Sequence, residues 1–349
     1  MPAKGSVPES RGGNRPYRRP RTTFLIAVGA AAALLTAACG SPGAAGEGGD
    51  GGGGDGGTST LKVTTLSLCN EISVLWAQQK GIFEKNGLTV ELVKAGGGAA
   101  GLAAVQGGSA NLAFTNPFST MLAMKSGIDL RWVATAYGTP KEGEDPSNAV
   151  LVKEDSPIKA GKDLEGKTVA VNELGGINQI IVQQFVTDAG GDPEKVKFVA
   201  LPFGELASAV ASGKVDASQA PEQYSNTPGV RSLGDPYMKV GKDKWLVFAG
   251  YVGTAKFVDE NTESMKKFLA SLKEANTAIK EPANQDEKYR IEAAHCGQDA
   301  KKLAEDPENP YFADVPMDAM KQMAQILVDQ GQTDKLPDVE KLVPEYSRS

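Results

Sequence analysis

The 349-residue sequence is poor in the side chains that most often perform catalysis or hold a metal ion. It contains one histidine, His295, and three cysteines, and aromatic residues make up only 6% of it. A histidine-based catalytic centre or a zinc site needs several such side chains close together. We therefore expect a protein that is not an enzyme, with no metal and no cofactor.

An excess of positive charge is also missing. The formal net charge is −6, and several of the arginines lie within the first 21 residues, so the remaining chain is more acidic still. Binding to nucleic acid requires a cationic surface that neutralises phosphates. Nucleic acid is therefore not an expected partner.

The N-terminal segment has the parts of an export signal. A basic stretch ending at Arg21 precedes an uncharged apolar run from Phe24 to Ala38. This run is shorter than the about 20 apolar residues that span a bilayer, which favours a cleaved signal peptide over residues 1–38. The string LTAAC resembles a bacterial lipobox, in which Cys39 receives a lipid and becomes the new N-terminus. The alternative is an ordinary signal peptide followed by an incidental cysteine.

Half of residues 39–60 are glycine, and the segment includes no large apolar side chain. Such a segment cannot bury enough surface to fold, so it is typical of a flexible tether. Together with a lipid on Cys39, it predicts a protein anchored to the extracytoplasmic face of the cell membrane. Outside the cell Cys69 and Cys296 could form a disulfide, or each could be a small buried side chain.

Apolar segments alternate with helical patterns through the first two-thirds of the chain. Strands are expected at 61–68, 88–94, 112–115 and 130–136, and the first three are each followed by a helix. Strands separated by helices indicate an α/β fold with mainly parallel sheets. A displacement of about 105 residues superposes Ile72 on Ile177 and Gly108 on Gly213, and the order of elements repeats with it.

Two similar α/β lobes are the simplest explanation of this repeat. We expect lobe I to comprise residues 61–150 and 250–349, and lobe II residues 151–249. The chain would cross between the lobes at 149–153 and at 246–252, which together form a hinge. An apolar helical stripe containing Met265, Phe268 and Leu272 is interpreted as core.

Four segments carry a resemblance to a known family. They are KGIFEKNGLTVEL from Lys80, the glycines at 96–98, LAFTNP from Leu112 and SPIKAGKDLEGKTVAV from Ser156. In this order they resemble the solute-binding proteins of ATP-driven (ABC) importers for nitrate, sulfonates, taurine and the thiamine pyrimidine. The resemblance implies a type II clamshell, like periplasmic binding proteins, that acts as a monomer and delivers a small solute to an ABC permease and its ATPase subunits.

Ligands of open α/β sheets lie beyond the carboxyl ends of the strands, where helix N-termini converge. This rule selects loops in both expected lobes, and the two sets should face one cleft. The expected ligand-binding residues are Asn70, Glu71, Gly97, Gly98, Asn116, Phe118, Tyr137, Glu173, Gly175, Gly176, Asn178, Phe203, Glu222 and Tyr224. Several have a structural alternative: the glycines could only permit turns, Asn116 could only cap a helix, and some aromatic rings could be core.

The charges on these loops give a conflicting indication about the solute. Helix N-termini and glycine amides favour anions, but Glu71, Glu173, Glu205 and Glu222 lie on the same loops and no arginine does. A carboxylate that points inward would favour an amine or a hydrogen-bonding heterocycle. The resemblance therefore does not establish the solute, which is expected to be a small polar organic molecule or an anion.

Two other functions remain open at this point. A binding protein of this type could report its solute to a sensor kinase instead of a permease. The resemblance also extends to eukaryotic pyrimidine synthases on the same fold, which depend on a cysteine-rich motif and an active-site histidine. Cys69 and Cys296 lie far apart in the sequence, and His295 is alone.

Overall fold

The computed structural model describes residues 59–305 and 308–349, without the side chains of Ser59, Glu222 and Gln223. The predicted signal peptide, the lipidation site Cys39 and nearly all of the predicted tether lie outside this part of the chain. The last two residues of the predicted tether belong to the first strand, which begins at Ser59. No helix in the described part is both long and apolar enough to cross a membrane.

Helices and strands mostly alternate from the first strand to α7. The first stretch contains β1 (Ser59–Thr65), α1 (Ile72–Gln79), α2 (Ile82–Lys85), β2 (Leu88–Lys94), α3 (Gly98–Gln106), β3 (Ala113–Thr115), α4 (Pro117–Lys125) and β4 (Leu130–Gly138). The second contains β5 (Asn148–Lys153), β6 (Thr168–Val171), α5 (Ile177–Asp188), β7 (Lys197–Ala200), α6 (Phe203–Ala211), β8 (Ala217–Pro221), β9 (Val230–Ser232) and α7 (Pro236–Gly241). The last contains β10 (Val247–Thr254), α8 (Ala255–Glu260), α9 (Thr262–Ala278), α10 (Gln285–Cys296), α11 (Ala300–Leu303), α12 (Met317–Asp329) and α13 (Val339–Leu342).

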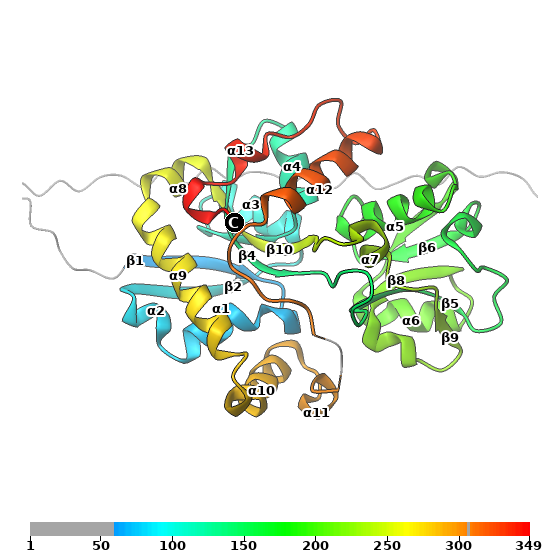
Figure 1. Cartoon of the computed structure of the whole chain (residues 1–349), viewed down its shortest axis with the longest axis horizontal. Helices are drawn as coiled ribbons and strands as arrows, with labels where there is room; N and C mark the ends of the chain where they lie inside the picture. Colours follow the sequence, from blue (N-terminus) through cyan, green and yellow to red (C-terminus); the bar gives the residue numbers. More distant parts are fainter. Residues whose placement is uncertain (1–58, 306–307) are drawn as a thin grey trace, which may run out of the picture. The chain divides into compact units, whose positions relative to one another are not determined.

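The strands form three sheets (Figure 1). The orders are β1-β2, β3-β10-β4 and β7-β6-β8-β5-β9. β1 pairs in parallel with β2, and β6 pairs in parallel with β7 and β8. β5 and β10 run antiparallel to all their partners. The α/β fold class is confirmed, but the sheets are mixed rather than mainly parallel, because each long connecting strand enters its sheet against the direction of its neighbours.

The internal repeat predicted from the sequence is visible in the order of the elements. The series β1, α1, β2, α3, β3 recurs as β6, α5, β7, α6, β8. In the first copy Val63 of β1 also bridges in parallel to Leu112, just before β3. In both copies a parallel central strand therefore lies between two others. β2, β3 and β7 of these outer strands lead into α-helices, whereas β8 leads into the short 3-10 helix Glu222–Asn226.

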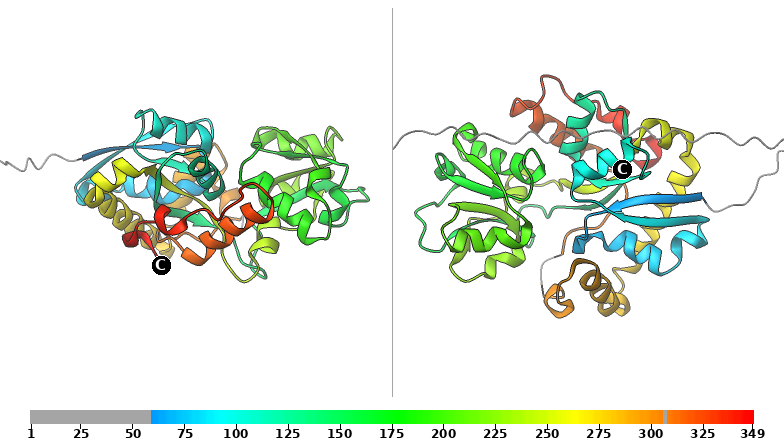
Figure 2. Two further views of the ribbon diagram at one scale, coloured as in Figure 1. Left: turned by 90° about the horizontal axis from the view of Figure 1, so that it is seen from above. Right: turned by 180° about the vertical axis from the view of Figure 1, so that it is seen from behind.

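The core follows the sequence pattern. The stripe expected from Met265 to Leu272 lies on α9 and is buried, and Phe268 stacks on Phe83 of α2 with ring centroids 5.5 Å apart. α9 packs along α1 and β2 (Figure 2). On the other side of the β3-β10-β4 sheet, Met320 and Met323 of α12 belong to the same apolar cluster as Met121 of α4.

Candidate functional site

Two adjoining cavities lie where the strand ends of the two repeat copies come together. The glycine cavity, about 290 Å³, is lined by Gly96–Gly98 and by residues that follow β3, β6 and β7. The tyrosine cavity, about 330 Å³, is lined mainly by residues of the loop after β1, of α10 and of the segment that follows α11. Leu68, Tyr137, Phe203 and Phe248 line both cavities, which makes them two compartments of one site.

Four helix N-termini border the glycine cavity. They are those of α3 at Gly97 and Gly98, α4 at Asn116, α5 at Ile177 and Asn178, and α6 at Pro202 and Phe203. The first backbone N–H groups of a helix have no partner within the helix, and the helix dipole makes this end positive. The helix ends that border the cavity therefore supply hydrogen-bond donors and the positive ends of their dipoles.

Glycine is required where α3 meets the sheet. A methyl group built on Gly98 would lie 2.6 Å from Oγ1 of Thr115, which is closer than carbon and oxygen can approach. The absence of a side chain lets the start of α3 sit directly against the end of β3. Oγ1 of Thr115 is buried and has no hydrogen-bond partner in the described part of the chain, although Thr115 lines the cavity.

Asn116 is a helix cap that also lines the glycine cavity. Its side-chain oxygen accepts a hydrogen bond of 2.9 Å from the backbone N–H of Ser119, and Pro117 begins α4. This is the N-cap arrangement that the sequence suggested. Phe118, two residues further on, is fully buried in the apolar cluster beneath α4 and lines neither cavity. The structure therefore places Phe118 in the core instead of the cavity wall, because its position on α4 points it at the sheet.

Asn178 is held by two partners at the start of α5. Its amide donates to Oδ1 of Asn172 at 2.5 Å, and its own Oδ1 accepts from the hydroxyl of Tyr237. Asn178 is buried and lines the glycine cavity. These two bonds fix its amide group and tie α5 to α7.

Glu173 is the carboxylate of the glycine cavity. It is half-buried and forms no hydrogen bond or ion pair within the described residues. Burial, which penalises the charged form, raises the pKa of Glu173 above its ordinary value. Gly175 and Gly176, which follow it, line neither cavity; Gly175 has the left-handed φ of 72° that favours glycine and allows the chain to turn into α5.

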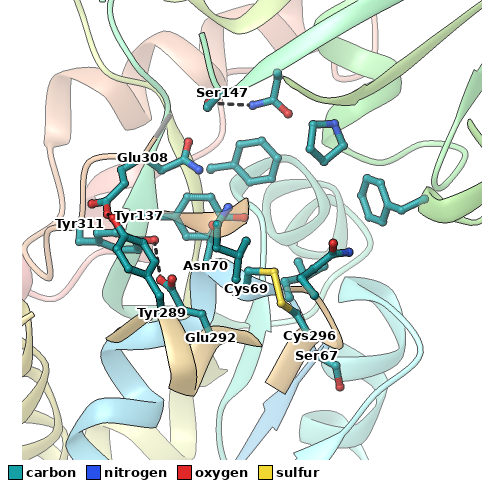
Figure 3. A pocket seen from close by; sticks show the side chains of 18 of the residues that line it. Ser67, Cys69, Asn70, Tyr137, Ser147, Tyr289, Glu292, Cys296, Glu308 and Tyr311 are labelled. Carbon is teal, nitrogen blue, oxygen red and sulfur yellow. Dashed lines mark hydrogen bonds between the residues drawn. A yellow bond between two sulfur atoms is a disulfide. The ribbon is translucent and has the colours of Figure 1, made fainter. Parts of the chain in front are cut away.

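The tyrosine cavity contains a compact group of charged and aromatic side chains (Figure 3). The ammonium group of Lys288, which is buried, contacts the carboxylate of Glu308 and lies 3.9 Å from that of Glu292. It also lies 4.4 Å from the ring centroid of Tyr289 and 5.7 Å from that of Tyr311. Burial raises the pKa of Glu292 to about 7, although the nearby ammonium of Lys288 lowers it. The positive charge of Lys288 is thus balanced within the cavity wall.

The loop after β1 is held rigidly against α10. Oε1 of Glu71 accepts hydrogen bonds of 2.9 Å from the backbone N–H groups of Leu66 and Leu68, and its other oxygen accepts from the hydroxyl of Thr65. Nε2 of His295 lies 3.0 Å from the same hydroxyl and 3.6 Å from Oε2 of Glu71. Glu71 is buried and lines neither cavity, so its carboxylate shapes the loop that presents Asn70.

Cys69 and Cys296 form a disulfide in the structure. The sequence left this pairing open. Both cysteines line the tyrosine cavity. The bond joins the loop after β1 to the end of α10 and so fixes one wall of the site.

The structure brings most of the predicted site residues together. Asn70 and Tyr224 line the tyrosine cavity, Tyr137 and Phe203 line both, and the following line the glycine cavity: Gly97, Gly98, Asn116, Glu173 and Asn178. Glu71, Phe118, Gly175 and Gly176 line neither. The side chain of Glu222 lies outside the described part of the chain.

Sequence reasoning did not find the contribution of α10 and the segment after it. Lys288, Tyr289, Glu292 and Tyr311 line the tyrosine cavity but follow no predicted strand end. The sequence offered one signal for their location, which was the possible pairing of Cys69 with Cys296. Within the described residues, no group of three or more His, Cys, Asp or Glu side chains is arranged to hold a metal ion.

Comparison with known proteins defines the class and then the family. The fold is that of type II periplasmic binding proteins. The alkanesulfonate-binding protein of Xanthomonas axonopodis pv. citri, solved with bound MOPS, matches with a TM-score of 0.66 at 17% identity, over 82% of this chain and 98% of that one. The nitrate-binding protein of Synechocystis PCC 6803 matches with a TM-score of 0.67 at 14% identity, over 82% of this chain and 86% of that one.

The family model described as NMT1/THI5 like matches residues 69–285, and the chain belongs to this family. A curated protein of Escherichia coli (strain K12), named as a candidate aliphatic sulfonates-binding protein, is 26% identical over 188 residues. That match covers 53% of this chain and 56% of the relative. The chain therefore spans about half the length of the curated relative that it matches.

Proposed function

We propose that this protein is the extracytoplasmic substrate-binding lipoprotein of an ABC importer and has no catalytic activity. It captures a small solute between two lobes, residues 61–150 with 250–349 and residues 151–249, and delivers it to the permease. The observation that carries this proposal is the pair of adjoining cavities at the strand ends of both repeat copies. The named relatives, which bind sulfonates or nitrate, support the same class of activity.

Two segments that connect the sheets suit a hinge. They are residues 139–147, between β4 and β5, and residues 242–246, between α7 and β10, and both begin before the crossings expected at 149–153 and 246–252. The backbone N–H of Thr139 donates to the carbonyl of Leu246 at 2.9 Å, and that of Glu142 donates to the carbonyl of Lys242 at 2.8 Å. The two connecting segments are therefore held side by side, and a small rotation about them would open or close the site. Lipid on Cys39 and the glycine-rich tether would keep the protein at the membrane while its lobes move.

Solute binding by purified protein tests this function. We expect at least one small polar solute to raise the melting temperature and to give a saturable calorimetric isotherm. Phe203→Ala and Tyr224→Ala, which truncate rings of the site, should weaken binding at least tenfold. Leu336→Ala removes an exposed apolar side chain away from both cavities and should leave binding unchanged.

The transport role is tested in cells. Deletion of the gene should abolish uptake of the solute that binds in vitro, and a Cys39→Ser variant should release the protein from the membrane. A deletion that alters only the transcriptional response to the solute, with uptake intact, would contradict transport and favour sensing. Binding that survives both ring truncations would contradict the location of the site.

A further inference from the structure

The four glutamates that the sequence placed near the cleft differ in their surroundings in the structure. Glu71 is fully engaged with the loop that it supports, and Glu205 is exposed on α6 and lines neither cavity. The side chain of Glu222 is not among those described. Of the three glutamates whose side chains are described, only Glu173 lines a cavity. It forms no hydrogen bond or ion pair with another described residue.

Glu173 lies where an anion would otherwise be favoured. A methyl group on Gly97, before α3, would lie 3.7 Å from Oε2 of Glu173, and one on Gly176, before α5, would lie 3.5 Å from the same oxygen. The carboxylate is thus close to the N-termini of two helices, whose positive ends attract negative charge. Because Glu173 already supplies that charge, the positive potential of these helix ends is offset before any solute arrives.

Among the described residues, no unpaired cationic side chain lines either cavity to attract an anionic solute. Lys288 is the one lysine or arginine among the described residues that line the two cavities, and it is paired with Glu308 and close to Glu292. An isolated charge in a poorly hydrated cavity is costly unless it is paired. A sulfonate in the glycine cavity would therefore meet the carboxylate of Glu173 with no positive side chain to compensate it.

Aromatic rings line the same cavity as this carboxylate. Tyr137, Phe203 and Phe248 line both cavities, and the rings of Tyr137 and Phe248 are stacked with centroids 5.1 Å apart. Ring faces attract cations, and their surfaces also bury the apolar part of a solute. The buried hydroxyl of Thr115, which has no partner among the described residues, offers a further hydrogen-bond acceptor to an N–H group.

We propose, on the basis of the binding function inferred above, that the solute is an organic cation. It carries a protonated amine that pairs with Glu173 and an apolar or aromatic body that packs on Tyr137, Phe203 and Phe248. Glu173 is then the residue that determines the charge of the solute. The site differs in this respect from one that selects sulfonate or nitrate.

A matched pair of probes tests this assignment. 2-Phenylethylamine and 2-phenylethanesulfonate share one body and carry opposite charges, and each is titrated into the purified protein at pH 7.5, with tyramine and choline as further cations. We expect a cation to bind at least tenfold more tightly than the sulfonate. Glu173→Gln should reduce this preference at least tenfold, whereas Glu205→Gln, the same change on an exposed residue, should preserve it. The melting temperature of each variant without solute serves as the folding control.

The possible failures are distinguishable. Saturable binding of 2-phenylethanesulfonate, MOPS or nitrate at least as tight as that of the cations would overturn the assignment and leave the binding function standing. A charge preference that persists in Glu173→Gln would overturn the role of this residue. Absence of saturable binding by all of these cations and anions would overturn the assignment and count against the proposed function as well.

Discussion

Cys69 and Cys296 are 227 positions apart in the sequence, yet their Cα atoms lie 5.0 Å apart and their side chains are joined. The bond connects the loop that follows the first strand to the last residue of α10. On each side of it stands a residue of the tyrosine cavity, Asn70 next to Cys69 and Glu292 one turn before Cys296. The disulfide therefore closes a very long loop and also holds one wall of the cavity.

Loss of this disulfide should destabilise the protein. A cross-link that closes a loop of this length restricts the unfolded chain, so we expect the double variant Cys69→Ser/Cys296→Ser to lose about 3–5 kcal/mol of unfolding free energy. Urea denaturation with and without a reducing agent measures the effect. Reduction should lower the stability of the wild-type protein and leave that of the double variant unchanged; equal midpoints for wild type and variant would contradict the prediction.

Two buried tyrosines should respond in opposite ways to removal of the hydroxyl group. The hydroxyl of Tyr237 donates to Asn178, so Tyr237→Phe leaves a buried acceptor unsatisfied and should cost about 1–3 kcal/mol. The hydroxyl of Tyr251 is buried without a partner in the described part of the chain, so Tyr251→Phe should be neutral or stabilising. Chemical denaturation of both variants checks this, and a larger loss for Tyr251→Phe would refute it.

The glycine run should tolerate alanine at one end and not at the other. In Gly98→Ala the new methyl group would collide with Thr115, which should cost about 1–3 kcal/mol and displace the start of α3. A methyl group on Gly96 meets no atom within 4 Å, so Gly96→Ala is the matched control and should keep wild-type stability. Thermal unfolding and solute titration of the two variants are the measurements. Equal melting temperatures and equal solute affinities in Gly98→Ala and Gly96→Ala would mean that the contact between α3 and β3 is not tight.

Glu292 should make stability depend on pH. Burial raises its pKa in the folded protein to about 7, above the 4.5 of an unperturbed glutamate, so the folded state holds the proton more tightly than the unfolded state. The contribution of Glu292 is therefore most favourable below about pH 4.5 and is lost as the pH rises to about 7.

The Glu292→Gln variant removes this titration. Relative to the variant, the wild-type protein should lose about 3 kcal/mol of unfolding free energy between pH 4.5 and 7. Denaturation curves across that range give the difference, and Glu205→Gln, on an exposed residue, is the control. Parallel stability curves for wild type and Glu292→Gln would contradict the assignment of the raised pKa.

Local elements were predictable where a strong pattern had clear ends. β2 occupies 88–94 as expected, because its apolar alternation is bounded by glycines. α4 begins at Pro117 after the Asn116 cap, which the two residue types indicate by themselves. The directions of β5 and β10 were not predictable in this way, because the pairing of a strand depends on where the rest of the sheet has been placed.

The site was predictable to the extent that strand ends define it. That rule located Glu173, Asn178 and Phe203, which follow β6 or β7. It also selected Phe118, whose direction depends on how α4 rests on the sheet, and it missed Lys288 and Tyr311, whose positions depend on the return path of the last third of the chain. Such long-range packing cannot be deduced from the local periodicity of apolar residues in the sequence.

The repeat separates the framework of the protein from much of the lining of its cavity. Its buried strands and helix stripes maintain the architecture, whereas several side chains that line the glycine cavity, such as Glu173 and Phe203, lie just beyond the strand ends. Glu173 lies outside the apolar clusters, whereas Phe203 also packs against one of them. Exchange of a side chain such as Glu173 can therefore change the chemistry of the cavity while the framework stays intact.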